Sequence, residues 1–314
     1  MHKRKIQLIA GSTYSISLPK EWILKNKLKE KDELNILEKD NGNLIISSNT
    51  NERTIDSIKL NIEDYKNIDR ILYSCYYLGI ETIDINSKKG FFKEERAKIK
   101  KAVNHMIGIE IITEENNKII LKNLLDKNKI DLKQLLNRMN LLISLTIDTL
   151  LEDFDINDIN INETEIDRLF HLATKIISLS LNDSKLLSSS NIKNVSLIPS
   201  YFLMCKKIEN IGDNISHLAL HLKKNKIDPK EYQEILELIK SEINRSMKHV
   251  SNDFPNIFDK IPEKERAEKK ESIYNIKDKI ISDYLKDTLR YLKDIEDEVI
   301  QLSFNKQLIR QGVL

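Results

Sequence analysis

The sequence predicts an α+β multidomain protein with a small β module, an α/β connecting domain and a C-terminal antiparallel helical bundle. Three observations support this fold class. Short segments alternate apolar and polar residues over the first fifty positions, strand-like and helix-like segments alternate over residues 51–128, and helical periodicity continues from Leu132 almost to the end. The low counts of glycine (7) and proline (5) also favour long helices with few tight turns.

The composition is typical of a globular chain. Of the 314 residues, 32% are charged and 40% are hydrophobic, and no apolar run is long enough to cross a bilayer. Cys75 and Cys205 lie far apart in apolar segments, which favours two buried thiols in a reducing compartment over a disulfide. We therefore expect a cytoplasmic protein without a transmembrane segment. The net charge of +2 excludes a chain that is basic throughout, although the first twenty residues are basic and contain no acid.

Residues 1–50 are predicted to form the β module. Strands are expected at residues 5–10 and 15–19, followed by a short helix at residues 20–28. A hairpin is expected around the turn Asp40-Asn41-Gly42, because both flanking segments alternate in period two. A module of this size buries little surface alone and usually needs a partner.

Residues 51–128 are predicted to form the connecting domain. Strand-like residues 55–61 and 81–87 alternate with helical residues 62–79 and 92–108, and a hairpin is expected around Asn116 and Asn117. Glycines at the ends of both helical segments suit helix C-termini. This alternation indicates a small α/β layer.

The remaining chain is predicted to form the bundle, divided into residues 129–226 and 227–314. The first part would hold helices at residues 132–154, 162–181 and 196–224, with Asn162 as the N-cap of the second helix. A fourth helix would begin after Asp228 and Pro229, and the tail from Glu263 to Leu308 would hold one long or two shorter helices. Short connections between long amphipathic helices favour an antiparallel bundle.

The N-terminal module resembles the swapped-hairpin AbrB/SpoVT type of DNA-binding domain. The resemblance rests on a basic first strand, the segment GSTYSISLPK, then KDEL and the hairpin segment GNLII, in that order. It implies a homodimer whose basic edge faces DNA. The residues assigned to that edge are Lys3, Arg4, Lys5, Ser12 and Lys20. The alternative is a dimerisation module with an incidental basic edge.

Two predicted bundle helices each carry a pair of acids four residues apart. These are Glu163 with Asp167, and Glu209 with Asp213. Residues at this spacing project from one helix face, so four carboxylates converge if the two helices are antiparallel neighbours. Crowded carboxylates repel, and oxygen ligands suit a hard cation. The pattern therefore predicts a divalent or trivalent metal ion (Mg, Mn, Fe or Zn). The alternative is that these acids are solvated or paired with nearby Arg168, Lys206 and Lys207.

The same acidic segments resemble PhoU-type phosphate-signalling proteins. ETEIDRLFHLATKII is similar to that family's first acidic motif and KKIENIGDNISHLA to its second, which places the four acids on the family's motif positions. That family's bundle consists of two three-helix repeats with metal clusters. An AbrB-like front with a PhoU-like bundle resembles the archaeal phosphate-uptake regulators. This resemblance implies a contact with the ATPase subunit of a phosphate ABC transporter.

The second predicted repeat departs from the motif. Lys293 stands where Glu209 stands in the first repeat, although Asp297 matches Asp213, and the middle segment at residues 262–278 is short and highly charged. A second metal site is therefore not predicted there. His217 and His221 have the spacing of helical metal ligands, but rotation along the helix carries His221 away from the acidic face. A zinc pair is the weaker alternative.

We therefore expect a DNA-binding transcriptional regulator of phosphate uptake with a metal-binding sensory bundle. One alternative is an accessory protein of the phosphate-transport ATPase whose N-terminal module only dimerises it. A metal-dependent hydrolase is the minor alternative. No phosphate-binding loop of the form GxxxxGK[ST] and no GxSxG nucleophile motif is present, so we do not expect an enzyme.

Overall fold

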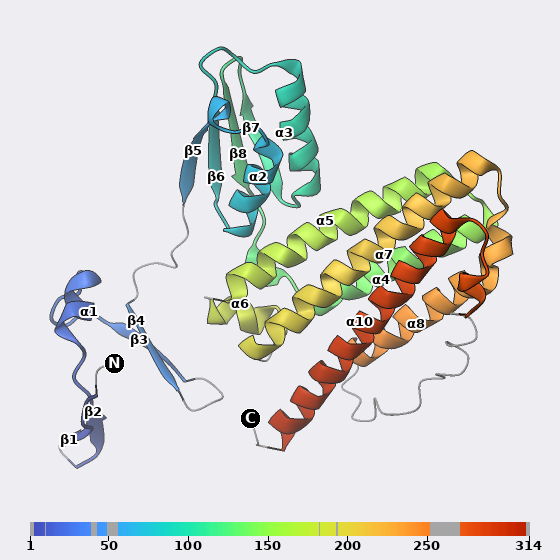
Figure 1. The fold of residues 1–314 in the computed structure, drawn as a ribbon. Coiled ribbons are helices and arrows are strands. Elements are labelled where there is room, and N and C mark those ends of the chain that lie inside the picture. The colour runs from blue at the N-terminus through green and yellow to red at the C-terminus, as the bar shows by residue number, and fades with distance from the viewer. Residues whose placement is uncertain are drawn as a thin grey trace. The chain divides into compact units, whose positions relative to one another are not determined.

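The computed structural model describes residues 3–9, 11–38, 43–48, 56–181, 183–192, 194–251 and 271–311. Contacts within the chain divide it into two units, residues 1–53 and residues 54–313 (Figure 1). The first unit is a small β module, and the second contains an α/β layer and the helical bundle. The fold is mixed α+β, as the sequence predicts.

Unit 1 consists of two short hairpins and one helix. β1 (Gln7–Ile9) pairs with β2 (Thr13–Ser15) through a turn at Gly11, whose φ of +74° favours glycine. α1 (Lys20–Lys25) follows Pro19, and β3 (Leu34–Glu38) pairs with β4 (Leu44–Ser48). The second predicted strand was placed too late, because pairing begins at Thr13. The predicted turn at residues 40–42 lies outside the described residues.

Many apolar side chains of unit 1 are exposed. None of its described residues is buried, and many of its large apolar residues are exposed, although Leu18, Trp22 and Ile46 are half-buried. Ile6 is 71% exposed, Tyr14 73% and Ile36 65%. Apolar exposure of this extent is typical of an interaction surface. The described residues of unit 1 therefore form no buried hydrophobic core within one chain.

The α/β layer is a four-stranded sheet in the order β5-β6-β8-β7. β5 (Ser57–Asn61) runs parallel to β6 (Thr82–Asn86), whereas β8 (Lys118–Asn123) pairs antiparallel with β6 and with β7 (Ile109–Glu114). The 3₁₀ turn η1 (Ile62–Asp64) precedes α2 (Ile68–Tyr77), and α3 (Lys93–His105) joins β6 to β7. Alternate residues such as Ile83 and Ile85 are buried with residues of α2 and α3 in one cluster, so one face of the sheet is covered.

The bundle contains long helices whose bounds largely match the sequence prediction. After the 3₁₀ turn η2 (Lys127–Lys129), these are α4 (Leu132–Glu152), α5 (Ile156–Ser180), α7 (Ile198–Asn225), α8 (Gln233–Ser251) and α10 (Lys279–Arg310). Short elements α6 (Ser184–Ser189), η3 (Val195–Leu197) and η4 (Pro229–Tyr232) connect them. Residues 271–274 are also helical, while most of the predicted middle helix at residues 262–278 lies outside the described residues.

Two sequence predictions about these helices were wrong. α5 begins at Ile156, because the Asp155 side chain accepts a hydrogen bond from the Asn157 amide and caps the helix. Asn162 is therefore a buried residue inside the helix rather than its N-cap. The short α6 was not predicted at all.

Most neighbouring helices run antiparallel, but α8 and α10 run parallel. In α5 and α7, for example, Ile166 contacts Gly212 and Asn160 contacts Ser216. The residue number rises along α7 as it falls along α5, so these two helices are antiparallel. For α8 and α10 the numbers rise together, at Arg245–Glu296 and Val250–Lys306. α8 and α10 are not joined by a short connection, so their parallel direction does not contradict the predicted antiparallel packing of helices that are. No helix in the described ranges combines the length and apolarity needed to cross a membrane.

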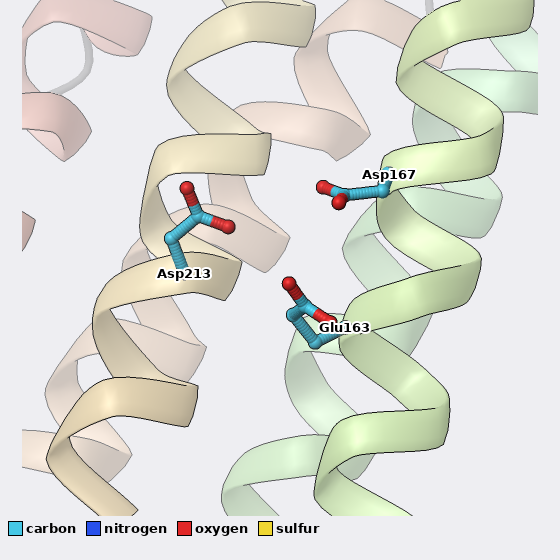
Figure 2. Close-up of side chains that lie close together, drawn as sticks. All are labelled: Glu163, Asp167 and Asp213. Atoms are coloured by element: carbon cyan, nitrogen blue, oxygen red, sulfur yellow. The ribbon is translucent and has the colours of Figure 1, made fainter. Parts of the chain in front are cut away.

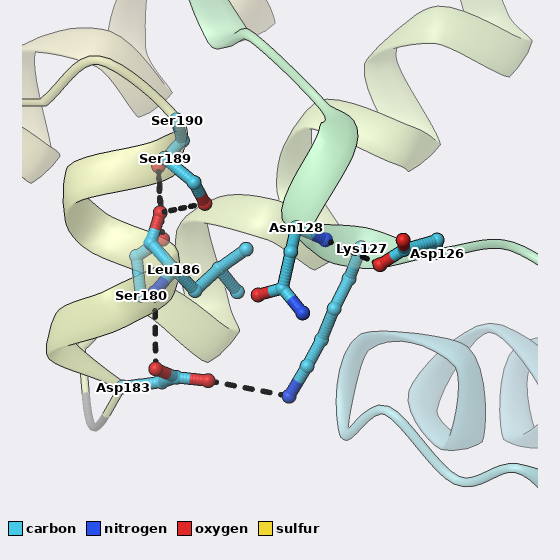
Figure 3. Close-up of polar contacts among 8 residues, drawn as sticks. All are labelled: Asp126, Lys127, Asn128, Ser180, Asp183, Leu186, Ser189 and Ser190. Carbon is cyan, nitrogen blue, oxygen red and sulfur yellow. Dashed lines mark hydrogen bonds and ion pairs between the residues drawn. The ribbon is translucent and has the colours of Figure 1, made fainter.

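The connection between α5 and α7 is tied to the segment that leads into α4 (Figure 3). Asp183 accepts a hydrogen bond from the Leu186 amide at the start of α6 and forms an ion pair with Lys127 at 3.2 Å. The hydroxyls of Ser189 and Ser190 donate to the Leu186 carbonyl. These contacts satisfy backbone groups at both ends of α6.

The α/β layer lies against α5, and Lys175 is the unusual residue of this contact. Its side chain is 1% exposed, and its ammonium lies 4.3 Å from the centre of the Tyr76 ring in α2. The ammonium has no hydrogen-bond partner in the described ranges. Burial, followed by repulsion from Lys127, lowers the pKa of Lys175 from its ordinary 10.5 to about 8.

We expect Lys175→Met to raise the free energy of unfolding at pH 7 by about 2 kcal/mol, since the buried charge costs about 3 kcal/mol and the ring contact offsets part of it. The folded-state pKa is lowered, so the cost is fully present below pH 8 and declines as pH rises towards 10.5. Urea unfolding at pH 7 and pH 9.5 measures this. The difference in the free energy of unfolding between the variant and the wild type should be smaller at pH 9.5 than at pH 7.

Lys224→Met is the matched control, because Lys224 is exposed on α7. An equal change in stability for the two variants would contradict the interpretation of Lys175 as a strained buried charge.

Candidate metal centre

Three carboxylates from two helices meet between α5 and α7. Glu163 and Asp167 lie one turn apart on α5, and Asp213 faces them from α7 (Figure 2). One ligand oxygen of each residue lies within 4.8 Å of those of the other two. Among the described residues this is the one group of three or more acidic, histidine or cysteine side chains with such spacing.

Gly212 allows the helices to approach at this level. A Cβ at position 212 would lie 3.2 Å from the Cδ1 atom of Ile166, which is tighter than ordinary contact. The glycine therefore lets α7 rest directly on the α5 side chain between the two acids. Asp213, the next residue, is brought opposite Glu163 and Asp167 by this contact.

The electrostatics of the cluster show crowding of like charge. Burial, then repulsion from Glu163, Asp213 and Glu209, raises the pKa of Asp167 from 3.8 to about 7. Burial is also the largest cause of the raised pKa of Glu163 and of Asp213. The protein alone therefore does not stabilise three charged carboxylates here. A bound cation would do so, because it offsets both the desolvation and the repulsion.

Glu209, the fourth predicted ligand, lies beside this cluster and is not a member of the close group. Its carboxylate is 2.5 Å from the ammonium of Lys206, one turn earlier on the same helix. Burial raises the pKa of Glu209 while Lys206 lowers it. The structure thus brings three of the four predicted acids together and places the fourth in an ion pair, one of the alternatives left open by the sequence.

The α/β layer supplies residues near the cluster that the sequence did not indicate. His105, the last residue of α3, lies 3.9 Å from the carboxylate of Asp167. Burial lowers the pKa of His105, so the neutral imidazole is favoured and the contact is not an ion pair at neutral pH. Sixty residues separate His105 from the acidic motif, and nothing in the local pattern links them.

Three further histidines, on α5 and α7, have contacts outside the close group of carboxylates. His171 shares a hydrogen bond with the Tyr77 hydroxyl and stacks on Tyr73, with ring centres 4.2 Å apart. His221 lies 2.8 Å from Asp278, and His217 stacks on Tyr284 of α10. None of these three belongs to the close group of carboxylates.

Among the residues of α10 that align with the acidic motif, one forms an ion pair and another is exposed. Asp294 forms an ion pair with Lys207 at 2.6 Å. Lys293, which occupies the position of the first acid, is exposed. These contacts give the last helix a structural role at the surface of α7.

The predicted DNA-facing residues are all exposed in unit 1. Lys3, Arg4 and Lys5 precede β1, Ser12 lies in the turn between β1 and β2, and Lys20 is the first residue of α1. The basic residues before β1 therefore lie at the open end of the hairpin, and Ser12 at its tip.

Comparison with known proteins gives one match, in the N-terminal part. Residues 7–54 match the family model described as antidote-toxin recognition MazE, bacterial antitoxin. These residues correspond closely to unit 1, which is thus an AbrB/MazE-like domain. No curated protein and no solved structure matches the chain.

The donor set of the cluster fits a hard cation. All three ligands are carboxylate oxygens, which suit Mg²⁺, Mn²⁺ or Fe³⁺ better than a soft metal, and zinc usually adds histidine or cysteine. Three protein ligands leave further positions of an octahedral ion for water.

We expect the metal-free folded protein to lose stability as pH rises. The folded pKa of Asp167 is raised, so the folded state holds an extra proton between about pH 4 and pH 7, and its ionisation costs about 4 kcal/mol. Asp167→Asn should remove most of this loss. Urea unfolding in chelator at pH 5 and pH 8 measures it.

Asp158→Asn is the control, since Asp158 is an exposed acid in the first turn of the same helix. If both variants show the wild-type dependence on pH, the carboxylates are not crowded in the folded protein.

Proposed function

We propose that this protein is a dimeric, cytoplasmic DNA-binding regulator of phosphate uptake whose bundle responds to a bound cation. The observation that carries the proposal is the match of residues 7–54 to an AbrB/MazE-like domain. Such a domain fits a DNA-binding or antitoxin-type regulatory role. The regulator acts through binding rather than through catalysis.

Dimerisation is supported by the exposure of apolar residues in unit 1. Tyr14, Ile36 and Leu44 are more than half exposed in the single chain. A second copy would bury such residues by completing both small modules together, at roughly 25 cal/mol for each Å² of apolar surface covered. This requirement agrees with the homodimer that the AbrB/SpoVT resemblance implies.

DNA binding is supported by the exposed basic residues before the first hairpin and at the start of α1. Lys3, Arg4, Lys5 and Lys20 are free to contact phosphates. Each phosphate contact releases counterions, so binding weakens as salt rises. The dimer would present these residues twice, on a two-fold DNA site.

Control of phosphate uptake is supported by the resemblance of the acidic helices to PhoU-type proteins. Cation binding by Glu163, Asp167 and Asp213 would relieve the repulsion among them and hold α5 against α7. The ATPase subunit of a phosphate transporter is the protein partner that this resemblance suggests.

A second candidate function follows from the description of the matched family. That description names toxin recognition by a bacterial antitoxin. The present chain would then regulate through binding a toxin as well as DNA. Co-purification of a small toxin with the full chain would favour this role.

We expect the wild type to bind operator DNA with a steep salt dependence, and the triple variant with Lys3, Arg4 and Lys5 changed to Ala to bind weakly. Each lost phosphate contact should reduce the slope of log K against log salt by about 0.9. Fluorescence anisotropy at about 50–200 mM salt measures the binding constant as a function of salt. The DNA sequences used are selected from random DNA.

The control replaces Lys122, Lys224 and Lys230, which are exposed lysines of unit 2, by Ala. It removes the same charge from the other unit. Equal binding by the two triple variants would contradict the assignment of the DNA-facing edge.

We also expect the metal content to depend on three acids and not on the fourth. After loading with Mn²⁺ and dialysis, Asp213→Asn should lose the bound ion, because one of three ligands becomes a neutral amide. Glu209→Gln should retain it, since the Glu209 carboxylate is paired with Lys206. Elemental analysis measures both, and equal metal content in wild type and Asp213→Asn would remove the site.

A further inference from the structure

A pocket of about 480 Å³ lies between α4 and α5. Its size falls within the range of small-molecule sites. Arg138 and Leu142 line it from α4, and residues between Asn160 and Arg168 line it from α5. None of the three clustered carboxylates lines this pocket, although Glu163 and Asp167 come from the same turns of α5. It is therefore separate from the candidate metal centre.

Most polar side chains of the pocket already have partners in the protein. Asn160 accepts a hydrogen bond from Ser216 at 3.5 Å, and the Thr164 hydroxyl donates to Glu163 at 3.4 Å. Glu165 pairs with Arg168 at 2.8 Å. These groups form part of the pocket wall. Because they already have partners, they are less available for hydrogen bonds to a ligand than groups without partners.

Three polar side chains of the wall keep groups without a protein partner within the described ranges. These are the exposed Arg138, Asn162, and Arg168, whose Nε atom is buried and unpaired. Asn162 is only 8% exposed, so its amide has little access to solvent except through the pocket. A ligand group in the pocket that accepts a hydrogen bond from this amide would give it a partner.

The charge of the pocket favours an anion. The wall of the pocket contains two guanidinium groups, on Arg138 and Arg168, and one carboxylate, on Glu165. The wall therefore carries a net positive charge. The planar fork of an arginine matches two oxygens of a carboxylate or phosphoryl group. An oxyanion is therefore the complementary ligand group.

The apolar part of the wall adds a second requirement. Leu142, which lines the pocket from α4, is buried, whereas Ile161, which lines it from α5, is 64% exposed. The volume also exceeds that of a bare phosphate or sulfate ion. A ligand with an apolar body next to its anionic group would cover both leucine and isoleucine.

We propose that this pocket binds a small organic oxyanion, with the anionic group on Arg138 and Asn162 and the apolar body on Leu142 and Ile161. The shared chemistry is a phosphate monoester or a carboxylate. The site is independent of the cation cluster, so it persists whether or not a metal binds there.

Isothermal titration calorimetry of the full chain with phenyl phosphate, benzoate and inorganic phosphate tests the proposal. Saturable binding of phenyl phosphate or benzoate, tighter than that of inorganic phosphate, is expected. The tighter of the two organic probes identifies the phosphate or the carboxylate class. Arg138→Gln should weaken binding about 10-fold, the usual loss when a charge-assisted hydrogen bond is removed.

Asn162→Leu should weaken binding about fivefold, since a neutral hydrogen bond is lost. Circular dichroism checks that this variant is folded, and Arg138→Gln tests the site without changing a buried residue. Arg290→Gln is the matched control, because Arg290 is an exposed arginine of α10. Asp213→Asn separates this site from the metal centre and should bind the probes as the wild type does.

Two results would overturn the proposal. One is the absence of saturable binding for all three probes. The other is wild-type affinity in Arg138→Gln.

Discussion

The close packing of α5 on α7 at Gly212 is the contact on which the candidate centre depends. The hydrogen side chain of Gly212 lets Ile166 fill the space between the helices. The acids that flank this contact must then face each other across it. Packing of apolar groups thereby buries Asp167 and brings other carboxylates near it, so burial first, and repulsion second, raise the pKa of Asp167. Strain of this kind is typical of sites that have a function.

The α/β layer also contacts α5, the helix that carries Glu163 and Asp167. His105 from α3 approaches Asp167, while Tyr73 and Tyr77 from α2 enclose His171. The layer therefore excludes water from one side of the acids and contributes to their burial. The 3.9 Å contact between His105 and Asp167 is where the α/β layer comes near the acidic cluster.

Unit 1 shows the opposite condition. Its strands and helix form with ordinary turns, but its apolar residues find no core inside one chain. AbrB/MazE-like domains typically dimerise, and association with a second copy would cover these exposed apolar residues.

The sequence by itself determined the elements and much of the site. Periodicity located the long helices, although it missed α6 and the first turns of α5. The spacing of Glu163 with Asp167, and of Glu209 with Asp213, identified one acidic face on each of two helices. These are local properties, since side chains three or four residues apart share a face in any helix. Only the tertiary structure decided which acids meet. Glu209 has the same spacing as its neighbours but pairs with Lys206, and His105 enters from a different layer. Pocket-lining Arg138 and Asn162, likewise, come together only where α4 and α5 pack, because contacts between distant segments depend on the global arrangement of helices and not on local pattern.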